Sequence, residues 1–208
     1  MTRPRQLSDD ARKILTVYIA SVYLVFTFLD LFMNAPCLVD WLRFTGIFAC
    51  FLMAKRRKAD LFLTLALFFT VCADACLLLL YWPPLGVLLF CFAHLFYILR
   101  NTGDIRLVVI TACLSVTVSA CLFYGLDLTL VTAFSIAYAI LFLINILTAL
   151  TLPKERPHKA MLLLGLLLFV LCDVNVAVYN LSLGSVSSVA GKLMWIFYMP
   201  SQVLLALS

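Results

Sequence analysis

The chain has 208 residues, of which 65% are hydrophobic and 12% are charged, and its formal net charge is +5. That apolar share exceeds the roughly 45 to 50% of an ordinary soluble domain, so the composition excludes that class. The basic residues stand in short clusters between apolar runs, a pattern typical of membrane topology rather than of a nucleic-acid surface. We therefore expect a polytopic integral membrane protein.

Eight apolar segments follow one another along the chain, most of them close to the roughly 20 residues that cross a bilayer. The first follows a short basic N-terminus and lacks the cleavage site of a secretory signal, so we interpret it as a membrane helix. We expect an all-α fold with one membrane domain over residues 1–208. The predicted spans are approximately 14–33, 38–53, 61–81, 85–99, 105–124, 128–152, 160–179 and 190–207.

Lysines and arginines predict the orientation. With the N-terminus inside, thirteen of the fifteen lie in inner segments and only Arg43 and Lys192 lie outside. The positive-inside rule then predicts that both termini are cytoplasmic. Asp30 and Asp40 fall near outer helix ends, where we expect headgroups to solvate them. The tryptophans also fall toward outer ends, as an interfacial belt would place them: Trp41, Trp82 and Trp195.

Two titratable side chains interrupt the apolar runs on either side of Tyr81-Trp82-Pro83-Pro84, namely Asp74 in the third segment and His94 in the fourth. The tight turn makes these helices antiparallel neighbours. At about 1.5 Å per residue, the two groups lie roughly 12 Å and 16 Å below the outer surface. A carboxylate in hydrocarbon costs about 2.5 to 3.5 kcal/mol, so it marks a functional site by default.

Asp173 lies in the seventh segment at nearly the depth of Asp74. We expect the two carboxylates and the His94 imidazole to converge at one level. A single such group could simply fix helix register, but three at a common depth favour a site. A metal site is disfavoured because one histidine and two aspartates are a thin ligand set.

Further polar and aromatic side chains are expected around this cluster from helical spacing and depth. The expected supports are Tyr97, Phe169, Asn180, Tyr198 and Gln202. Arg43 could contact a phosphate or snorkel to the interface, and Lys192 lies on the same outer side. Asn145 and Ser115 are expected to form interhelical hydrogen bonds, and His158 to be solvated. Seven of the eight cysteines lie inside apolar runs, so we expect small buried side chains rather than disulfides or zinc ligands.

Four sequence features together resemble a known family: Ala73-Asp74, Gly86-x3-Phe90-x2-Ala93-His94-x2-Tyr97, Gly165-x3-Phe169-x3-Asp173 and Tyr198-x3-Gln202. In order and spacing they are similar to the eight-span YhhN-type membrane proteins, whose characterised members are lysoplasmalogenases. The chain departs from that family at Ala73, where Gly is expected, at Cys172, where Ser is usual, and at Arg43, where the second helix normally has Lys. These departures bear on headgroup preference.

The resemblance implies hydrolysis of the vinyl ether bond of a lysoplasmalogen, in a bacterial cytoplasmic membrane, to a fatty aldehyde and glycerophosphoethanolamine or glycerophosphocholine. The expected partners are this lysophospholipid and membrane lipids, with no cofactor, metal, nucleic acid or protein partner. In this hypothesis one of Asp74 and Asp173, in either order, is the catalytic acid and the other its ionised partner, and His94 orients or deprotonates the water. Arg43, Lys192, Tyr97, Asn180, Tyr198 and Gln202 would contact the substrate.

Two alternatives stay open. In the first, a transporter or lipid-binding protein uses the same carboxylates to relay protons or hold a cation. In the second, a membrane hydrolase cleaves another bond. The chain has no GxSxG motif, which argues against a serine lipase.

Overall fold

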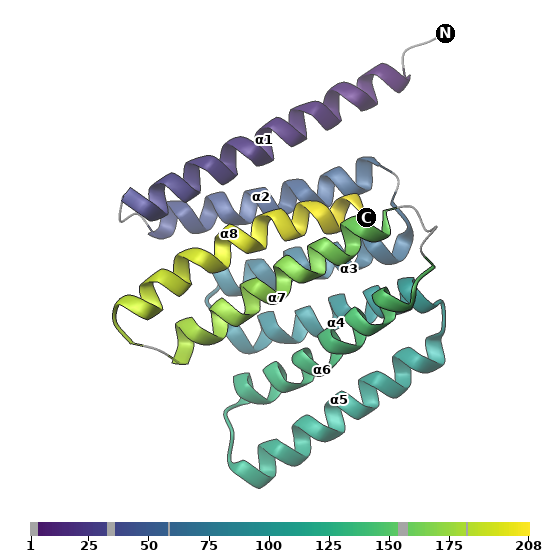
Figure 1. Ribbon diagram of the computed structural model, residues 1–208, viewed down its shortest axis with the longest axis vertical. Coiled ribbons are helices and arrows are strands. Elements are labelled where there is room, and N and C mark those ends of the chain that lie inside the picture. Colours follow the sequence, from purple (N-terminus) through teal and green to yellow (C-terminus); the bar gives the residue numbers. More distant parts are fainter. Residues whose placement is uncertain (1–3, 33–35, 58, 154–157, 182) are drawn as a thin grey trace. The chain divides into compact units, whose positions relative to one another are not determined.

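The computed structural model describes residues 4–32, 36–57, 59–153, 158–181 and 183–208, and within these ranges the regular structure is helical (Figure 1). Met33, the end of the first predicted span, lies outside them. The elements are α1 (Pro4–Phe32), α2 (Pro36–Arg56), α3 (Leu61–Asp74), the π-helical turn η1 (Ala75–Leu79), α4 (Pro83–Thr102), α5 (Ile105–Leu126), α6 (Leu130–Thr151), α7 (Lys159–Leu181) and α8 (Ser185–Leu207).

Eight helices in the described ranges are long and apolar enough to cross a membrane. This confirms the expected all-α fold, and the chain is a multi-pass membrane protein. Several helices are longer than predicted, because polar residues continue them past the apolar core. In α2, for example, Lys55 and Arg56 form the last turn, where basic side chains interact favourably with the helix dipole. The cytoplasmic location of both termini stays a prediction.

The helices pack in two groups of four, which we name by their place in the chain. The terminal group contains α1, α2, α7 and α8, and the central group contains α3 to α6. In the terminal group α7 packs along α8, and α8 also contacts α1 and α2. In the central group α4 lies between α3 and α6, and α5 packs on α6. The single membrane domain over residues 1–208 stays a prediction.

The α3–α4 hairpin is fixed at both ends. Asp60 caps α3 by accepting a hydrogen bond from the Leu63 backbone N–H (2.8 Å), and its second carboxylate oxygen accepts one from Arg100 Nε of α4 (2.8 Å). At the other end the chain leaves η1 and reverses through Tyr81, which has a left-handed φ of 50°. The predicted turn and antiparallel pairing are therefore present.

Gly86 allows α4 to approach α3 closely beside Asp74. A Cβ atom at this position would lie 2.6 Å from Cγ of Leu77 and 3.2 Å from the carbonyl oxygen of Ala73. The first distance is shorter than atoms tolerate, and the second involves backbone that cannot swing away. Glycine is thus required here for packing, and the contact fixes the helical turn that carries the aspartate.

Substitution Gly86→Ala should destabilise the protein by about 1 to 3 kcal/mol, because the added methyl group overpacks this contact. Unfolding in detergent, followed by circular dichroism, measures the change. Gly125→Ala is the matched control, since a Cβ there meets no atom within 4 Å and alanine has the higher helix propensity. Equal stability of the two variants would contradict the close approach at Gly86.

The structure shows no disulfide among the described cysteines, and the expectation of buried side chains holds for four of them: Cys50, Cys76, Cys91 and Cys172. It is wrong for Cys113 and Cys121, which are exposed on α5. This helix packs mainly on α6 and leaves much of its apolar surface uncovered, so a small side chain on it faces outward.

Candidate functional site

Asp74 is the last α-helical residue of α3 and is buried, with 2% of its surface exposed. The π-helical turn begins at the next residue, and the Leu80 N–H reaches back to the Ala75 carbonyl at 3.1 Å. Such turns inside α-helices are frequent at functional sites, because they widen the helix locally and re-aim the neighbouring side chains. The carboxylate therefore lies inside the helix packing, at an irregularity of the backbone.

Aromatic contacts fix the register of α3 against α4. The Phe69 ring lies 5.5 Å from the Phe92 ring and 5.4 Å from the Phe96 ring, which makes Phe69 level with His94. Asp74 is five residues further along α3, so it lies closer to the interhelical turn than Phe69 does. The depths of Asp74 and His94 below the outer surface stay a prediction.

His94 lies in an aromatic environment in the central group. Its ring is 1% exposed and stacks on Phe142 of α6, with ring centroids 4.6 Å apart and planes 23° apart. Tyr138, also of α6, lies 5.0 Å away, and Tyr97 lies 6.3 Å away on α4 itself. Tyr97 is 1% exposed, so its predicted place beside His94 is confirmed. These rings prevent the imidazole from changing its orientation.

A chain of polar side chains extends from His94 between α4 and α6. Asn145 Nδ2 lies 3.1 Å from His94 Nδ1, and Asn101 Nδ2 lies 3.1 Å from Asn145 Oδ1. Asn101 Nδ2 is also 3.3 Å from Thr148 Oγ1, whose hydroxyl donates to the Asn145 backbone carbonyl at 2.9 Å. We call these four residues the His94 relay. Because they come from two helices, they fix the packing of α4 on α6 as well as the imidazole.

The expected interhelical role of Asn145 is thus confirmed, whereas the expectation for Ser115 is not, since its hydroxyl bonds to the Ala112 carbonyl of its own helix. Sequence reasoning missed Asn101 and Thr148. The signal was present in the spacing: Asn101 is seven residues from His94, and Thr148 is three from Asn145, so each pair shares a helix face.

In the terminal group, Asp173 is partly buried on α7. Phe169, one turn earlier, packs edge-on against Tyr198 of α8 at 5.4 Å, and Tyr198 packs in the same way against Trp195. Phe169 and Tyr198, two of the side chains expected around the site, are therefore in contact within this group. The nearness of Tyr198 to Asp173 stays a prediction.

Gln202, one turn beyond Tyr198, is fully buried, and neither atom of its amide has a hydrogen-bond partner among the described residues. The hydroxyl of the adjacent Ser201 is in the same situation. A buried polar atom without a partner costs about 1 to 3 kcal/mol. Such groups call for a specific explanation, and contact with a bound polar molecule is one that fits a substrate site.

Asn180 is exposed near the end of α7, and its amide donates to the Val176 carbonyl of the same helix at 2.7 Å. His158 is exposed as expected. Among the residues that the structure describes, no three His, Cys, Asp or Glu side chains gather closely enough to hold a metal ion.

Arg43 is enclosed by charged and aromatic groups of the terminal group. Its guanidinium donates to Asp30 at 2.5 Å and to Asp40 at 2.9 Å, and it lies 4.3 Å from the centre of the Trp195 ring. The side chains of Asp30 and Asp40 are only 18% and 16% exposed, so the expectation that headgroups solvate them is wrong. The guanidinium of Arg43 does not extend to the interface, because two carboxylates and an indole hold it inside.

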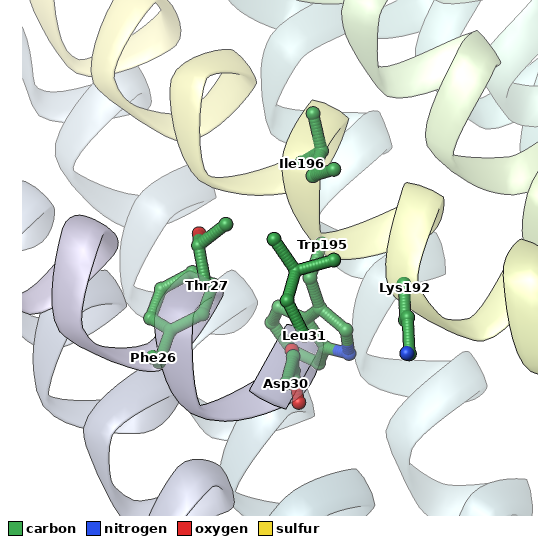
Figure 2. A pocket seen from close by; sticks show the side chains of 7 residues that line it. All are labelled: Phe26, Thr27, Asp30, Leu31, Lys192, Trp195 and Ile196. Atoms are coloured by element: carbon green, nitrogen blue, oxygen red, sulfur yellow. The ribbon is translucent and has the colours of Figure 1, made fainter. Parts of the chain in front are cut away.

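Trp195 is likewise buried rather than part of an interfacial belt, since its indole covers Arg43. Beside it, α1 and α8 enclose a small hollow (Figure 2) lined by Phe26, Thr27, Asp30, Leu31, Lys192, Trp195 and Ile196. The Lys192 ammonium, the Asp30 carboxylate and the indole nitrogen of Trp195 point toward the same side in Figure 2. The atoms Thr27 Oγ1 and Trp195 Nε1 lack hydrogen-bond partners in the described part of the chain.

Replacing Arg43 by methionine should destabilise the protein by about 2 to 4 kcal/mol, because it leaves two mostly buried carboxylates without their cation. Denaturant titration in detergent measures the loss. Lys55→Met, an exposed position of the same helix, is the control and should cost under about 1 kcal/mol. If the two variants unfolded at the same denaturant concentration, Arg43 would not hold α1, α2 and α8 together.

The structure thus brings the predicted residues together in two sets. Asp74, His94 and Tyr97 lie in the central group. The terminal group contains Asp173, Tyr198 and Gln202, and also Arg43 and Lys192 around Asp30. The meeting of Asp173 with Asp74 and His94 remains a prediction.

Comparison with known proteins gives one result. The sequence model of the YhhN family matches residues 36–208. That range begins at α2 and contains every residue of both sets except Asp30. No curated protein and no solved structure matches the chain.

Proposed function

The chain belongs to the YhhN family, and we propose that it hydrolyses the vinyl ether bond of lysoplasmalogens in a bacterial cytoplasmic membrane. The products would be a fatty aldehyde and glycerophosphoethanolamine or glycerophosphocholine. The observation that carries this proposal is the buried carboxylate of Asp74, which is only 2% exposed and lies next to a π-helical turn. The neighbouring helix carries the His94 imidazole, which stacks on an aromatic ring. Intramembrane ionisable groups are costly and are therefore functional by default.

The chemistry requires an acid and an anion. A carboxylic acid protonates the outer alkene carbon, and the electron pair of the C=C bond forms the new C–H bond, which leaves an oxocarbenium ion. Water adds to this ion and gives its proton to the carboxylate, which forms a hemiacetal. The hemiacetal then breaks its C–O bond, releasing the aldehyde and returning a proton to the glycerol oxygen. The acid is regenerated, and no cofactor is consumed.

Asp74 and Asp173 are the proposed carboxyl pair, because one member of a close pair can hold the proton while the other stays ionised and stabilises the oxocarbenium ion. This assignment requires that the two groups meet in the folded protein. Tyr97 and Tyr198 would support the reacting groups. The uncommitted amide of Gln202 would bind a polar atom of the substrate.

The arrangement also suggests how a single-chain lipid would lie. Asp74 and His94 lie on neighbouring helices of one hairpin, which suits an extended chain that runs parallel to the helices. At the headgroup end, Arg43 is already bonded to two carboxylates, so Lys192 is the better candidate for the phosphate. Asn180, exposed near the end of α7, could contact the headgroup from outside.

Purified Asp74→Asn and Asp173→Asn variants should each lose aldehyde release from a lysoplasmalogen by roughly 10²-fold or more, because the amide can neither donate an acidic proton nor carry charge. Asp127→Asn is the matched control. Asp127 is exposed with a left-handed φ of 51°, which asparagine tolerates, so its rate should equal that of the parent. Unchanged turnover in either buried variant removes that residue from the reaction. A transporter or lipid-binding protein would release no aldehyde in detergent, so the same assay tests that alternative.

Lys192→Met should raise KM for the lysoplasmalogen by roughly tenfold with little change in kcat, because a phosphate contact remote from the ether bond stabilises ground and transition states alike. Initial rates over a range of substrate concentrations give both constants. A fall in kcat at constant KM would instead place Lys192 in the chemical step.

A further inference from the structure

We infer that the His94 relay fixes the imidazole as the neutral tautomer with its proton on Nε2, so that Asn145, Asn101 and Thr148 are positioning residues and His94 is a hydrogen-bond donor rather than a base. The inference concerns the proton position first. Its consequence for the reaction rests on the proposed function.

The direction of the relay starts at Thr148. Its hydroxyl has one proton, which it donates to the Asn145 backbone carbonyl at 2.9 Å. Toward Asn101, Thr148 Oγ1 can therefore only accept, which requires that the Asn101 atom 3.3 Å away is the amide nitrogen. A flipped Asn101 would place two oxygens against each other with no proton between them. The Asn101 amide is thus oriented by a hydroxyl whose own proton is committed.

The Asn145 amide is oriented in turn by Asn101. Asn101 Nδ2 donates its second proton at 3.1 Å, so the facing atom of Asn145 is the carbonyl oxygen Oδ1. The other end of that amide, Nδ2, then faces His94 Nδ1 at 3.1 Å. An amide nitrogen is a donor only, so Nδ1 must accept and cannot carry a proton. The remaining proton of the neutral ring is on Nε2, and a doubly protonated ring would oppose one donor to another.

The inferred tautomer changes the role of His94 in the water-activating step, because the sequence hypothesis allowed His94 to deprotonate the water. With Nδ1 engaged by Asn145, His94 presents an N–H group at Nε2, which can hold a carboxylate, a substrate oxygen or a water molecule but cannot take a proton from it. The proton of the attacking water must therefore pass to a carboxylate, the group that gave up its proton to the alkene. His94 orients, and the acid pair performs both proton transfers.

Nitrogen-15 resonances of histidine test the proton position directly. The chain has two histidines, and His158→Asn removes the exposed one, at a left-handed φ of 66° that asparagine tolerates. The full-length protein, labelled at histidine and purified in detergent through a tag without histidines, then reports on His94 alone. We expect Nδ1 to resonate as a pyridine-type nitrogen and Nε2 as a pyrrole-type nitrogen bearing a proton. The reverse pattern, or two pyrrole-type signals, overturns the inference, and this measurement needs only the parent protein.

Variants identify which residues set the tautomer. Asn145→Asp replaces the donor that faces Nδ1 by an acceptor of the same shape, so the two nitrogen patterns should exchange. Thr148→Val frees the Asn101 amide to turn, so the signals should move toward an average of both tautomers. The matched control is Thr111→Val, a buried threonine of α5 whose hydroxyl also bonds three residues back, and it should leave the signals unchanged. An unchanged pattern in Asn145→Asp contradicts the relay.

The consequence for the reaction has a separate readout. If His94 donates from Nε2, Asn145→Asp should lower aldehyde release by roughly 10²-fold, the effect of losing one oriented donor at a reacting centre, while Thr111→Val keeps the parent rate. Absence of aldehyde release from the parent would reject the proposed function but would leave the nitrogen signals, and hence the tautomer, unaffected. A parent tautomer as inferred with full activity in Asn145→Asp would confine the relay to a structural role.

Discussion

Polar groups buried between membrane helices have no solvent to bond with, and this constraint explains most of the specific contacts in the structure. Hydrocarbon offers neither donors nor acceptors, so each polar side chain inside the protein must find its partner on a neighbouring helix or on its own backbone. In the central group the His94 relay supplies such partners between α4 and α6, and in the terminal group Asp30 and Asp40 supply them for the two terminal nitrogens of Arg43. Both clusters also specify which helices pack together and in what register, because contacts between apolar surfaces alone do not fix the register of two helices.

The two clusters differ in the polar groups that they make available to a substrate. The two terminal guanidinium nitrogens of Arg43 bond to Asp30 and Asp40, and the Trp195 ring covers the group, so Arg43 holds α1, α2 and α8 in place. The relay, by contrast, ends at an imidazole, and the hydrogen bonds determine which nitrogen of that ring carries the proton. Neither atom of the Gln202 amide has a hydrogen-bond partner among the described residues, whereas the Asn145 amide bonds at both atoms and the Asn101 amide bonds through its nitrogen. The His94 imidazole and the Gln202 amide are therefore groups that a lipid substrate could contact.

The buried titratable side chains are also the ones on which the family resemblance rests. Asp74, His94, Asp173 and Gln202 belong to the motifs on which the sequence resembles the YhhN family, and all four lie within helix packing or at its edge. Asn101, Asn145 and Thr148 belong to none of the motifs considered, yet they hold the imidazole. A reaction that needs an acid, an anion and an oriented donor therefore depends on residues that motif reading passes over.

The sequence by itself determined the eight membrane helices, the α3–α4 turn and the titratable residues worth attention, because length, hydropathy and the cost of charge in hydrocarbon are local properties of a segment. The partners of those residues were decided only by the tertiary structure. Asp30 and Asp40 looked solvated from their positions near helix ends, but Arg43 pairs with both, from the neighbouring helix in the case of Asp30 and from the same helix in the case of Asp40. The π-helical turn after Asp74 was not predicted, and the role of Asn101 and Thr148 depends on the packing of α6 against α4. Hydrogen bonds between helices depend on the register and rotation of each helix against its neighbour. Side chains that are far apart in the sequence determine both.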